Sequence, residues 1–301
     1  MSKPRAPERW AADLSIVLRQ VLGESRFPIR VDRLALEYSR QRYPEDPITR
    51  VRSRPLSGFE GALIRAKRVE DGWGIAFADS INSEGRKAFT IAHEFGHYLI
   101  HRAAYPAGFQ CRQEDMLLWT SEYNQIEQQA NRFAADLLMP RDDFRAQIAP
   151  RDRPNLDRLG LCAERYGVSL TAATLRWLDY TERRAMLVVA RDGFILWACS
   201  SDPAFKSGAY IKTRGVSPRP VPPGSLADLS CRSHDLDPVA HHSAGVWMPE
   251  PVEEQILLSD RYDLTLSLLH LPGAGPRAMW QEEGTADTLD AIQRAWPTGR
   301  L

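Results

Sequence analysis

Three histidines and a glutamate are concentrated in residues 86–102, which have the sequence RKAFTIAHEFGHYLIHR. His93, His97 and His101 are spaced four residues apart, so on a helix they form one stripe, with Glu94 beside it. The rest of the segment is mainly apolar, which indicates that the stripe faces a cleft in the protein and not solvent. Two histidines at positions i and i+4 can direct their ring nitrogens at one metal ion, as in zinc sites.

Glu94 has a different role in this arrangement, because it points to the side of the histidine stripe. It is poorly placed to bind the metal and well placed to take a proton from a water held there. This division of labour is that of the HExxH motif, in which the metal lowers the pKa of water to about 7 and the glutamate is the base. The alternative is that the histidines are satisfied core residues, since HExxH occurs by chance in roughly one such sequence per hundred.

A catalytic zinc site needs a third protein ligand, and residues 123–140 (YNQIEQQANRFAADLLMP) offer one. Helical spacing places Glu127 and Asn131 on the buried face, where a metal would offset the cost of burying a carboxylate. An ion pair with an arginine is the alternative for Glu127. Asn131 is predicted to orient a ligand histidine through its other ring nitrogen. His101 is the competing third ligand, although it lies about 12 Å along the helix axis from His93.

The segments FTIAHEFGHYLIH and EQQANRFAADLLMP together resemble the ImmA/IrrE metallopeptidases, a bacterial and phage family. The two β-like runs before the histidine helix and the YGVS segment also fit this family, and the resemblance covers residues 28–180. It implies a zincin-like domain in which His93, His97 and Glu127 hold zinc, with manganese as the alternative metal, and Glu94 is the base. It further implies that the substrate is an Xre- or Cro-type helix-turn-helix repressor, whose cleavage relieves repression of a mobile element or a stress regulon.

The elements that must position these residues follow from local patterns. Helical spacing is found in residues 8–22 and 28–43, and Ser83 can cap the histidine helix. The β-like runs are 61–67 and 73–78, and the second is a candidate edge strand for an extended substrate. Further on, residues 155–184 resemble a helix pair that turns at Gly167. A hairpin at residues 191–193, a strand at 264–271 and a helix at 286–296 follow.

These elements predict an α+β fold in three parts. Residues 1–150 form the zincin-like metallopeptidase domain, 151–184 a helix-turn-helix-like segment and 185–301 a C-terminal mixed α/β domain. Some members of the family carry a GAF-like sensor domain in the last position, and the pattern is compatible with one. The second helix of the pair, LTAATLRWLDY, has one arginine and several apolar residues. We therefore expect it to pack or to dock a substrate, and direct DNA binding is not expected.

Composition restricts the other partners and the compartment. The formal net charge is zero, which gives no global attraction to nucleic acid or anionic membranes. The sequence predicts no signal peptide and no membrane-spanning run. The cysteines are far apart and form no CxxC pair, which favours buried thiols in a reducing cytoplasm. They are Cys111, Cys162, Cys199 and Cys231.

The sequence alone leaves some alternatives open. HDLDPVAHH (residues 234–242) is interpreted as a solvated loop, with a second metal site as the alternative. Tyr98, His101 or a residue outside the motif could donate a further hydrogen bond during hydrolysis. The favoured function is a metal-dependent endopeptidase. Its rivals are a non-proteolytic regulator that binds a repressor or DNA around a structural metal, and a metal-dependent toxin of a toxin–antitoxin pair.

Overall fold

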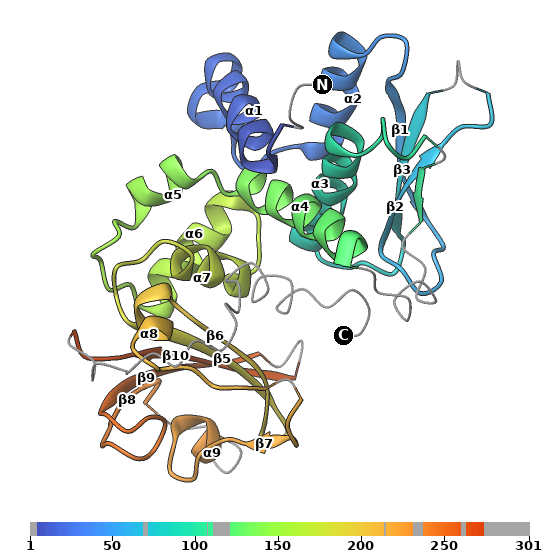
Figure 1. Cartoon of the computed structure of the whole chain (residues 1–301). Helices are drawn as coiled ribbons and strands as arrows, with labels where there is room; N and C mark the ends of the chain where they lie inside the picture. The colour runs from blue at the N-terminus through green and yellow to red at the C-terminus, as the bar shows by residue number, and fades with distance from the viewer. Residues whose placement is uncertain are drawn as a thin grey trace. The chain divides into compact units, whose positions relative to one another are not determined.

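The computed structural model forms two compact units, which are described separately (Figure 1). The first unit comprises residues up to Asp143 together with Ala163–Ser169, and the second comprises Phe144–Cys162 and the chain from Leu170 onward. The described residues are 5–68, 72–106, 108–110, 121–213, 215–230, 237–259 and 263–273. The predicted three-part division of the chain stays a prediction.

The first unit contains a four-stranded sheet with the order β1-β3-β2-β4. Its strands are β1 (Ile48–Arg54), β2 (Gly61–Arg65), β3 (Trp73–Ala78) and β4 (Gly108–Gln110). β1 runs parallel to β3, and the other neighbours are antiparallel. The prediction that residues 73–78 form an edge is therefore wrong. β1, in which arginine and serine interrupt any apolar run, pairs with the outer side of β3 and forms that edge.

Helices precede and follow these strands in the chain, and they include the two that carry the chemistry-bearing residues. They are α1 (Pro7–Leu22), the 3-10 helix η1 (Gly23–Arg26), α2 (Val31–Arg42), α3 (Glu84–Ile100), α4 (Ser121–Leu138) and α5 (Arg141–Gln147). α3 packs on β2, β3 and α4, while α4 also contacts α1. Ser83 caps α3 as predicted, because its hydroxyl accepts a hydrogen bond from the Arg86 amide at 3.4 Å. The sheet and α4 thus fix the histidine helix on two sides.

Asp143 holds distant parts of the first unit together. Its carboxylate accepts hydrogen bonds from Arg26 at 2.6 Å, from Arg165 at 2.9 and 3.1 Å, and from the Tyr166 hydroxyl at 2.6 Å. Both guanidinium groups also stack near the ring of Phe27, at 4.4 and 5.0 Å from its centroid. The Asp143 side chain is only 9% exposed, so these bonds satisfy a carboxylate that would otherwise be costly to bury.

The second unit is built on a six-stranded antiparallel sheet with the order β7-β6-β5-β10-β9-β8. Its strands are β5 (Ala185–Arg191), β6 (Phe194–Ser200), β7 (Arg219–Pro220), β8 (Val239–His242), β9 (Val252–Ser259) and β10 (Leu264–His270). The predicted hairpin is confirmed: Asp192 and Gly193 both have positive φ, 50° and 75°, as a tight turn between twisted strands requires. The predicted strand near residue 264 is confirmed as β10.

Among the described residues, four helices accompany this sheet: α6 (Leu156–Tyr166), α7 (Leu170–Leu178), α8 (Asp202–Lys206) and α9 (Leu226–Ser230). The predicted helix pair is confirmed as α6 and α7, joined at Gly167, which has φ +63°. The end of α6 and the turn after it belong to the first unit, and the remaining helices to the second. Mixed helix and sheet in both units confirm the predicted α+β class.

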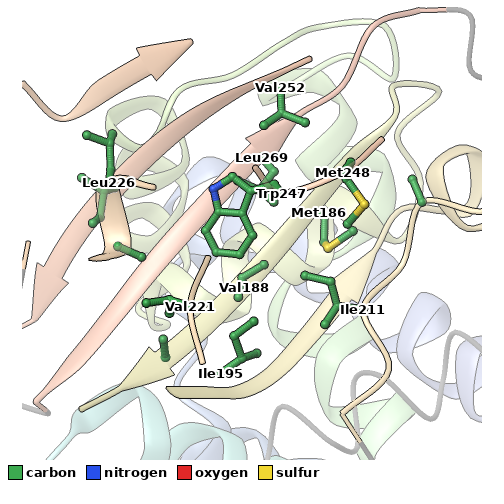
Figure 2. Packing of buried hydrophobic residues seen from close by; sticks show 14 of the residues in the cluster. Met186, Val188, Ile195, Ile211, Val221, Leu226, Trp247, Met248, Val252 and Leu269 are labelled. Carbon is green, nitrogen blue, oxygen red and sulfur yellow. The ribbon is translucent and has the colours of Figure 1, made fainter. Parts of the chain in front are cut away.

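Apolar side chains pack on one side of the six-stranded sheet around the indole of Trp247 (Figure 2). Met186 and Val188 of β5 and Leu269 of β10 are completely buried there or nearly so. The Trp247 ring nitrogen donates a hydrogen bond at 2.8 Å to Glu254, a buried carboxylate on β9. This contact ties the loop before β9 to the sheet.

His242 corrects the interpretation of residues 234–242 as a solvated loop. Residues 239–242 form β8, and the His242 ring donates to Glu254 at 2.8 Å with only 9% of the side chain exposed. Glu254 is twelve residues away in the sequence, and the pairing of β8 with β9 brings the two residues together. His234 and Asp235 lie outside the described residues.

Several other predictions concern residues that are also outside the described ranges. These are the helix at 286–296 and the thiols of Cys111 and Cys231. Cys162 and Cys199 are buried thiols, as predicted. No helix in the described part of the chain has the length and apolar character needed to cross a membrane.

Candidate metal centre

His93, His97 and Glu127 form a compact group where α3 packs against α4. The Nε2 atoms of the two histidines are 2.9 Å apart. Glu127 Oε2 lies 3.2 Å from His93 Nε2, and Glu127 Oε1 lies 3.3 Å from His97 Nε2. Within the described part of the chain this is the one group of three or more such side chains that could hold a metal ion. The structure therefore brings the two predicted histidine ligands and the predicted third ligand together.

The separations fit a metal better than they fit a set of hydrogen bonds. A tetrahedral ion with bonds of about 2.0–2.1 Å would hold its ligand atoms about 3.3 Å from one another. Two ring nitrogens at 2.9 Å place their lone pairs against each other unless a cation or a proton lies between them. Two imidazoles and a carboxylate are also the donor set of known catalytic zinc sites. The residues present thus fit a divalent metal.

The charges at this group lead to the same conclusion. Burial raises the pKa of Glu127, but His97 and His93 outweigh burial and hold that pKa well below its usual value. Burial lowers the pKa of His93, while the hydrogen bond and charge of Glu127 raise it to about 9. Glu127 is consequently an anion that requires a positive charge beside it, which a divalent cation would supply.

Asn131 orients His93 from the next turn of α4. Its side-chain oxygen Oδ1 lies 2.9 Å from His93 Nδ1 and accepts the proton on that nitrogen. This leaves His93 Nε2 directed at Glu127 and His97. The contact is the one expected from the sequence for an amide that holds a metal-ligating imidazole in one tautomer.

His97 is oriented by a relay of two side chains. His97 Nδ1 lies 3.1 Å from His101 Nδ1, and His101 Nε2 lies 3.0 Å from the side-chain oxygen of Gln129. Because the Gln129 oxygen can only accept, His101 carries its proton on Nε2 and accepts the proton of His97 on Nδ1. Burial, with the charge of His97, lowers the pKa of His101 to about 4, which keeps its ring neutral.

This relay places His101 behind a ligand and not in the ligand set, because its ring contacts the nitrogen of His97 that faces away from Glu127. Gln129 was not predicted. Its position two residues after Glu127 gives it no common helix face with that residue, and only the packing of α4 on the end of α3 brings it to His101.

Glu94 is buried beside the ligand group, at the N-terminal end of β2. Its side chain lies against Gly61, where a Cβ atom would be 2.5 Å from Glu94 Oε1. Burial and the charge of Glu127 raise the pKa of Glu94 to about 8, although His93 and a hydrogen bond from the Leu63 amide act in the opposite direction. Glu94 Oε2 is buried and has no hydrogen-bond partner among the described residues.

Such an acceptor is suited to a water or a substrate amide at the same place. The importance of Gly61 was not predicted, because the residue lies in an ordinary strand pattern. A glycine inside a strand, which often marks a close approach, was the one available signal.

Gly96, inside the motif, sets the distance between α3 and α4. A Cβ atom there would lie 2.9 Å from Phe133 Cδ1 and 3.3 Å from the Cα atom of Ala130. Glycine is unfavourable within a helix by about 1 kcal/mol, so its presence indicates a packing requirement. The close approach of the two helices is what brings Glu127 to the histidines.

Tyr98 does not take part in the metal centre, and its prediction as a supporting residue is wrong. Its ring is fully buried among Tyr43, Trp73 and Phe95, and its hydroxyl donates to the Asp46 carbonyl at 2.6 Å. These partners lie on the α2 and sheet side of α3. Burial raises the pKa of Tyr98 to about 12.

Residues 44–178 match the family model described as the IrrE N-terminal-like domain, Peptidase_M78. This region begins just before β1 and ends with α7, and it contains every residue of the candidate metal centre. No curated protein sequence matches the chain.

Proposed function

We propose that this chain is a zinc-dependent endopeptidase of the IrrE type whose substrate is a helix-turn-helix repressor, and the match of residues 44–178 to the IrrE N-terminal-like domain supports this. The observation that carries the proposal is the separation of two roles within one buried site. Three ligand atoms converge within 4.8 Å, while a fourth polar group, Glu94, lies beside them and is not part of that group.

A bound divalent metal supplies Lewis acidity, which lowers the pKa of a water and polarises a scissile carbonyl. The protein must then accept a proton and return it. Glu94 has a buried, unpaired oxygen and a raised pKa, both of which suit a group that takes a proton from water and gives it to the departing amine. Gly61 leaves room for this carboxylate, and the Leu63 amide holds it.

The remaining residues keep the ligands in place. Asn131 fixes the ring of His93, and the pair His101 and Gln129 fixes the ring of His97. With both Nδ1 atoms protonated, both Nε2 atoms are available to a metal without rearrangement. Two neutral imidazoles and one carboxylate favour zinc, and manganese is the alternative because it accepts the same donors.

The repressor substrate rests on the family match and on the burial of α7, the second helix of the predicted pair. All residues from Ala172 to Leu178 of α7 are buried, so this helix offers little surface to a DNA groove. A protein substrate cleaved at the metal centre would let the chain act on transcription without contacting DNA.

The experiment uses full-length protein and a small helix-turn-helix repressor encoded beside its gene. Wild type, Glu94→Gln and Glu127→Ala are incubated with the repressor and zinc or manganese, and products are followed by intact mass. We expect two fragments with wild type. Glu94→Gln should keep about one metal per chain and cleave more slowly by about a hundredfold or more. Glu127→Ala should lose both metal and cleavage.

The same variants distinguish the rival functions. If wild type and Glu94→Gln relieve repression equally in cells, hydrolysis is not the mechanism and the protein acts by binding its partner. If wild type kills cells that contain no repressor and Glu94→Gln does not, a toxin replaces the proposal.

A further inference from the structure

Three arginines form a row on β1. This strand lies at one edge of the first sheet (Figure 1). Arg50, Arg52 and Arg54 alternate along the strand, so their side chains leave the same face about 6.7 Å apart. All three residues are exposed, and their guanidinium groups form no ion pair with a carboxylate in the described ranges. Three like charges in such a row repel one another, and a partner of opposite charge would remove this cost.

The face that carries the row is the one turned away from α3. Gly61 of β2 points at Glu94 and Thr90 of α3, so Leu63, two residues on, shares that side. The residues that alternate with them on β2 point to the opposite side of the sheet. The registers of β2 with β3 and of β3 with β1 place the three arginines on that opposite side. The row is therefore separate from the metal centre, which lies on the helical side of the same sheet.

Strand register makes this face a groove. Arg50 is paired with Gly74 and Arg52 with Ala76 on β3, and Gly74 is in turn paired with Ile64 on β2. Across the sheet, long side chains on β1 therefore lie beside small residues on β3. On the other side of β3, the larger side chain of Ile64 on β2 is 40% exposed. The resulting hollow of about 220 Å³ runs along β3, with the arginines on one wall.

We propose that this groove binds an extended, acidic segment of a protein partner, with carboxylates at alternate positions facing Arg50, Arg52 and Arg54. An extended chain repeats its side chains with the same period as β1, so every second residue can meet one guanidinium. The residues between them face the small floor and Ile64, which suits short apolar side chains. Arginine forms bidentate pairs with carboxylates, which gives such a contact a defined register.

Nucleic acid fits the groove less well. Single strands bind on exposed aromatic rings that stack with bases, and the one aromatic residue in the lining, Trp73, is 2% exposed. The chain also has no net positive charge that would attract a phosphate backbone.

The test measures fluorescence anisotropy of a labelled peptide in which Glu and Val alternate, with full-length protein at low salt. Replacement of the three arginines by glutamine should weaken binding by about tenfold or more, and added salt should weaken binding to wild type. The matched control removes three exposed arginines from α2, by Arg33→Gln, Arg40→Gln and Arg42→Gln, and should leave binding unchanged. Chelation of metal should also leave binding unchanged, because the groove is on the opposite face from the metal centre.

Charge reversal provides a second variant. Arg50→Glu, Arg52→Glu and Arg54→Glu together should abolish binding of the Glu–Val peptide and create binding of a Lys–Val peptide. Equal binding to wild type and to the glutamine variant would overturn the proposal, as would no binding at low salt. Tighter binding of a single-stranded oligonucleotide than of the peptide would replace it with a nucleic-acid site.

Discussion

Gly61 and Glu94 face each other across the contact between β2 and α3, and a Cβ atom at position 61 would lie 2.5 Å from Glu94 Oε1. The glycine therefore determines where the proposed base can be. Gly61→Ala must displace the Glu94 carboxylate or the Thr90 methyl group, which would be 2.7 Å away.

We expect Gly61→Ala to keep its metal and to lose about a hundredfold in kcat/KM, because a displacement of about 1 Å at a reacting group has that effect. Elemental analysis would measure the metal content, and cleavage assays on the same sample would measure kcat/KM. Gly160→Ala is the control, since its Cβ meets nothing within 4 Å and its helix is unrelated to the site. Loss of metal from Gly61→Ala would show that the glycine supports the ligands and not the base.

Gly96→Ala should act on the ligands. The added methyl group presses on Phe133 and on the Ala130 backbone, so α4 must move outward and take Glu127 with it. We expect a loss of about 1–3 kcal/mol in unfolding free energy and about tenfold weaker metal binding. Chelator competition measures the metal affinity, and thermal unfolding measures the change in stability. Adding Phe133→Leu should recover part of the metal affinity, and no recovery would indicate that the backbone contact dominates.

His101 and Gln129 should affect metal affinity without binding metal. Each of His101→Ala and Gln129→Ala is expected to weaken it by about 10–100-fold, because His97 is no longer held in one tautomer. Nitrogen-15 NMR of the histidine rings should show mixed tautomers at His97 in both variants. Tyr98→Phe is the control, because its hydroxyl bonds to Asp46 and should affect stability alone. Complete metal loss in His101→Ala would instead make His101 a ligand.

Asp143 should make the stability of the first unit depend on pH. Burial raises its pKa, but hydrogen bonds from Arg165 and Tyr166 outweigh burial and hold the pKa of Asp143 below its usual value. Because the folded pKa is the lower one, the stabilisation is complete above a pH of about 4 and is lost as pH falls through the folded pKa. Asp143→Asn should therefore cost about 3 kcal/mol near neutral pH, and less in acid.

Urea unfolding of both proteins at a pH of about 7 and about 3 would measure this difference. Asp142→Asn is the control, because that carboxylate is 65% exposed and should matter little at either pH. An equal difference between Asp143→Asn and wild type at both pH values would contradict the prediction.

The sequence by itself determined the parts of this protein that depend on spacing along one element. His93 and His97 share a helix face because four residues nearly complete a turn, and that relation holds in any fold that keeps the helix. The Ser83 cap and the turn at Asp192 and Gly193 are equally local. Glu127 could be proposed because a carboxylate on an apolar helix face needs a partner, although its actual partner is on another helix.

Only the tertiary structure decided which distant residues meet. Gly61, Gln129 and the edge position of β1 depend on how a strand, a helix end and a sheet are packed, and no repeat along the chain encodes those distances. Tyr98 shows the same limit, because its place near the histidine stripe suggested a role that its packing against Tyr43 and Trp73 removes. Helical periodicity determines the direction in which a side chain leaves one helix. A site also depends on the distances between helices and strands. The volumes of the side chains packed between them set those distances, as the absence of a side chain at Gly96 does for α3 and α4.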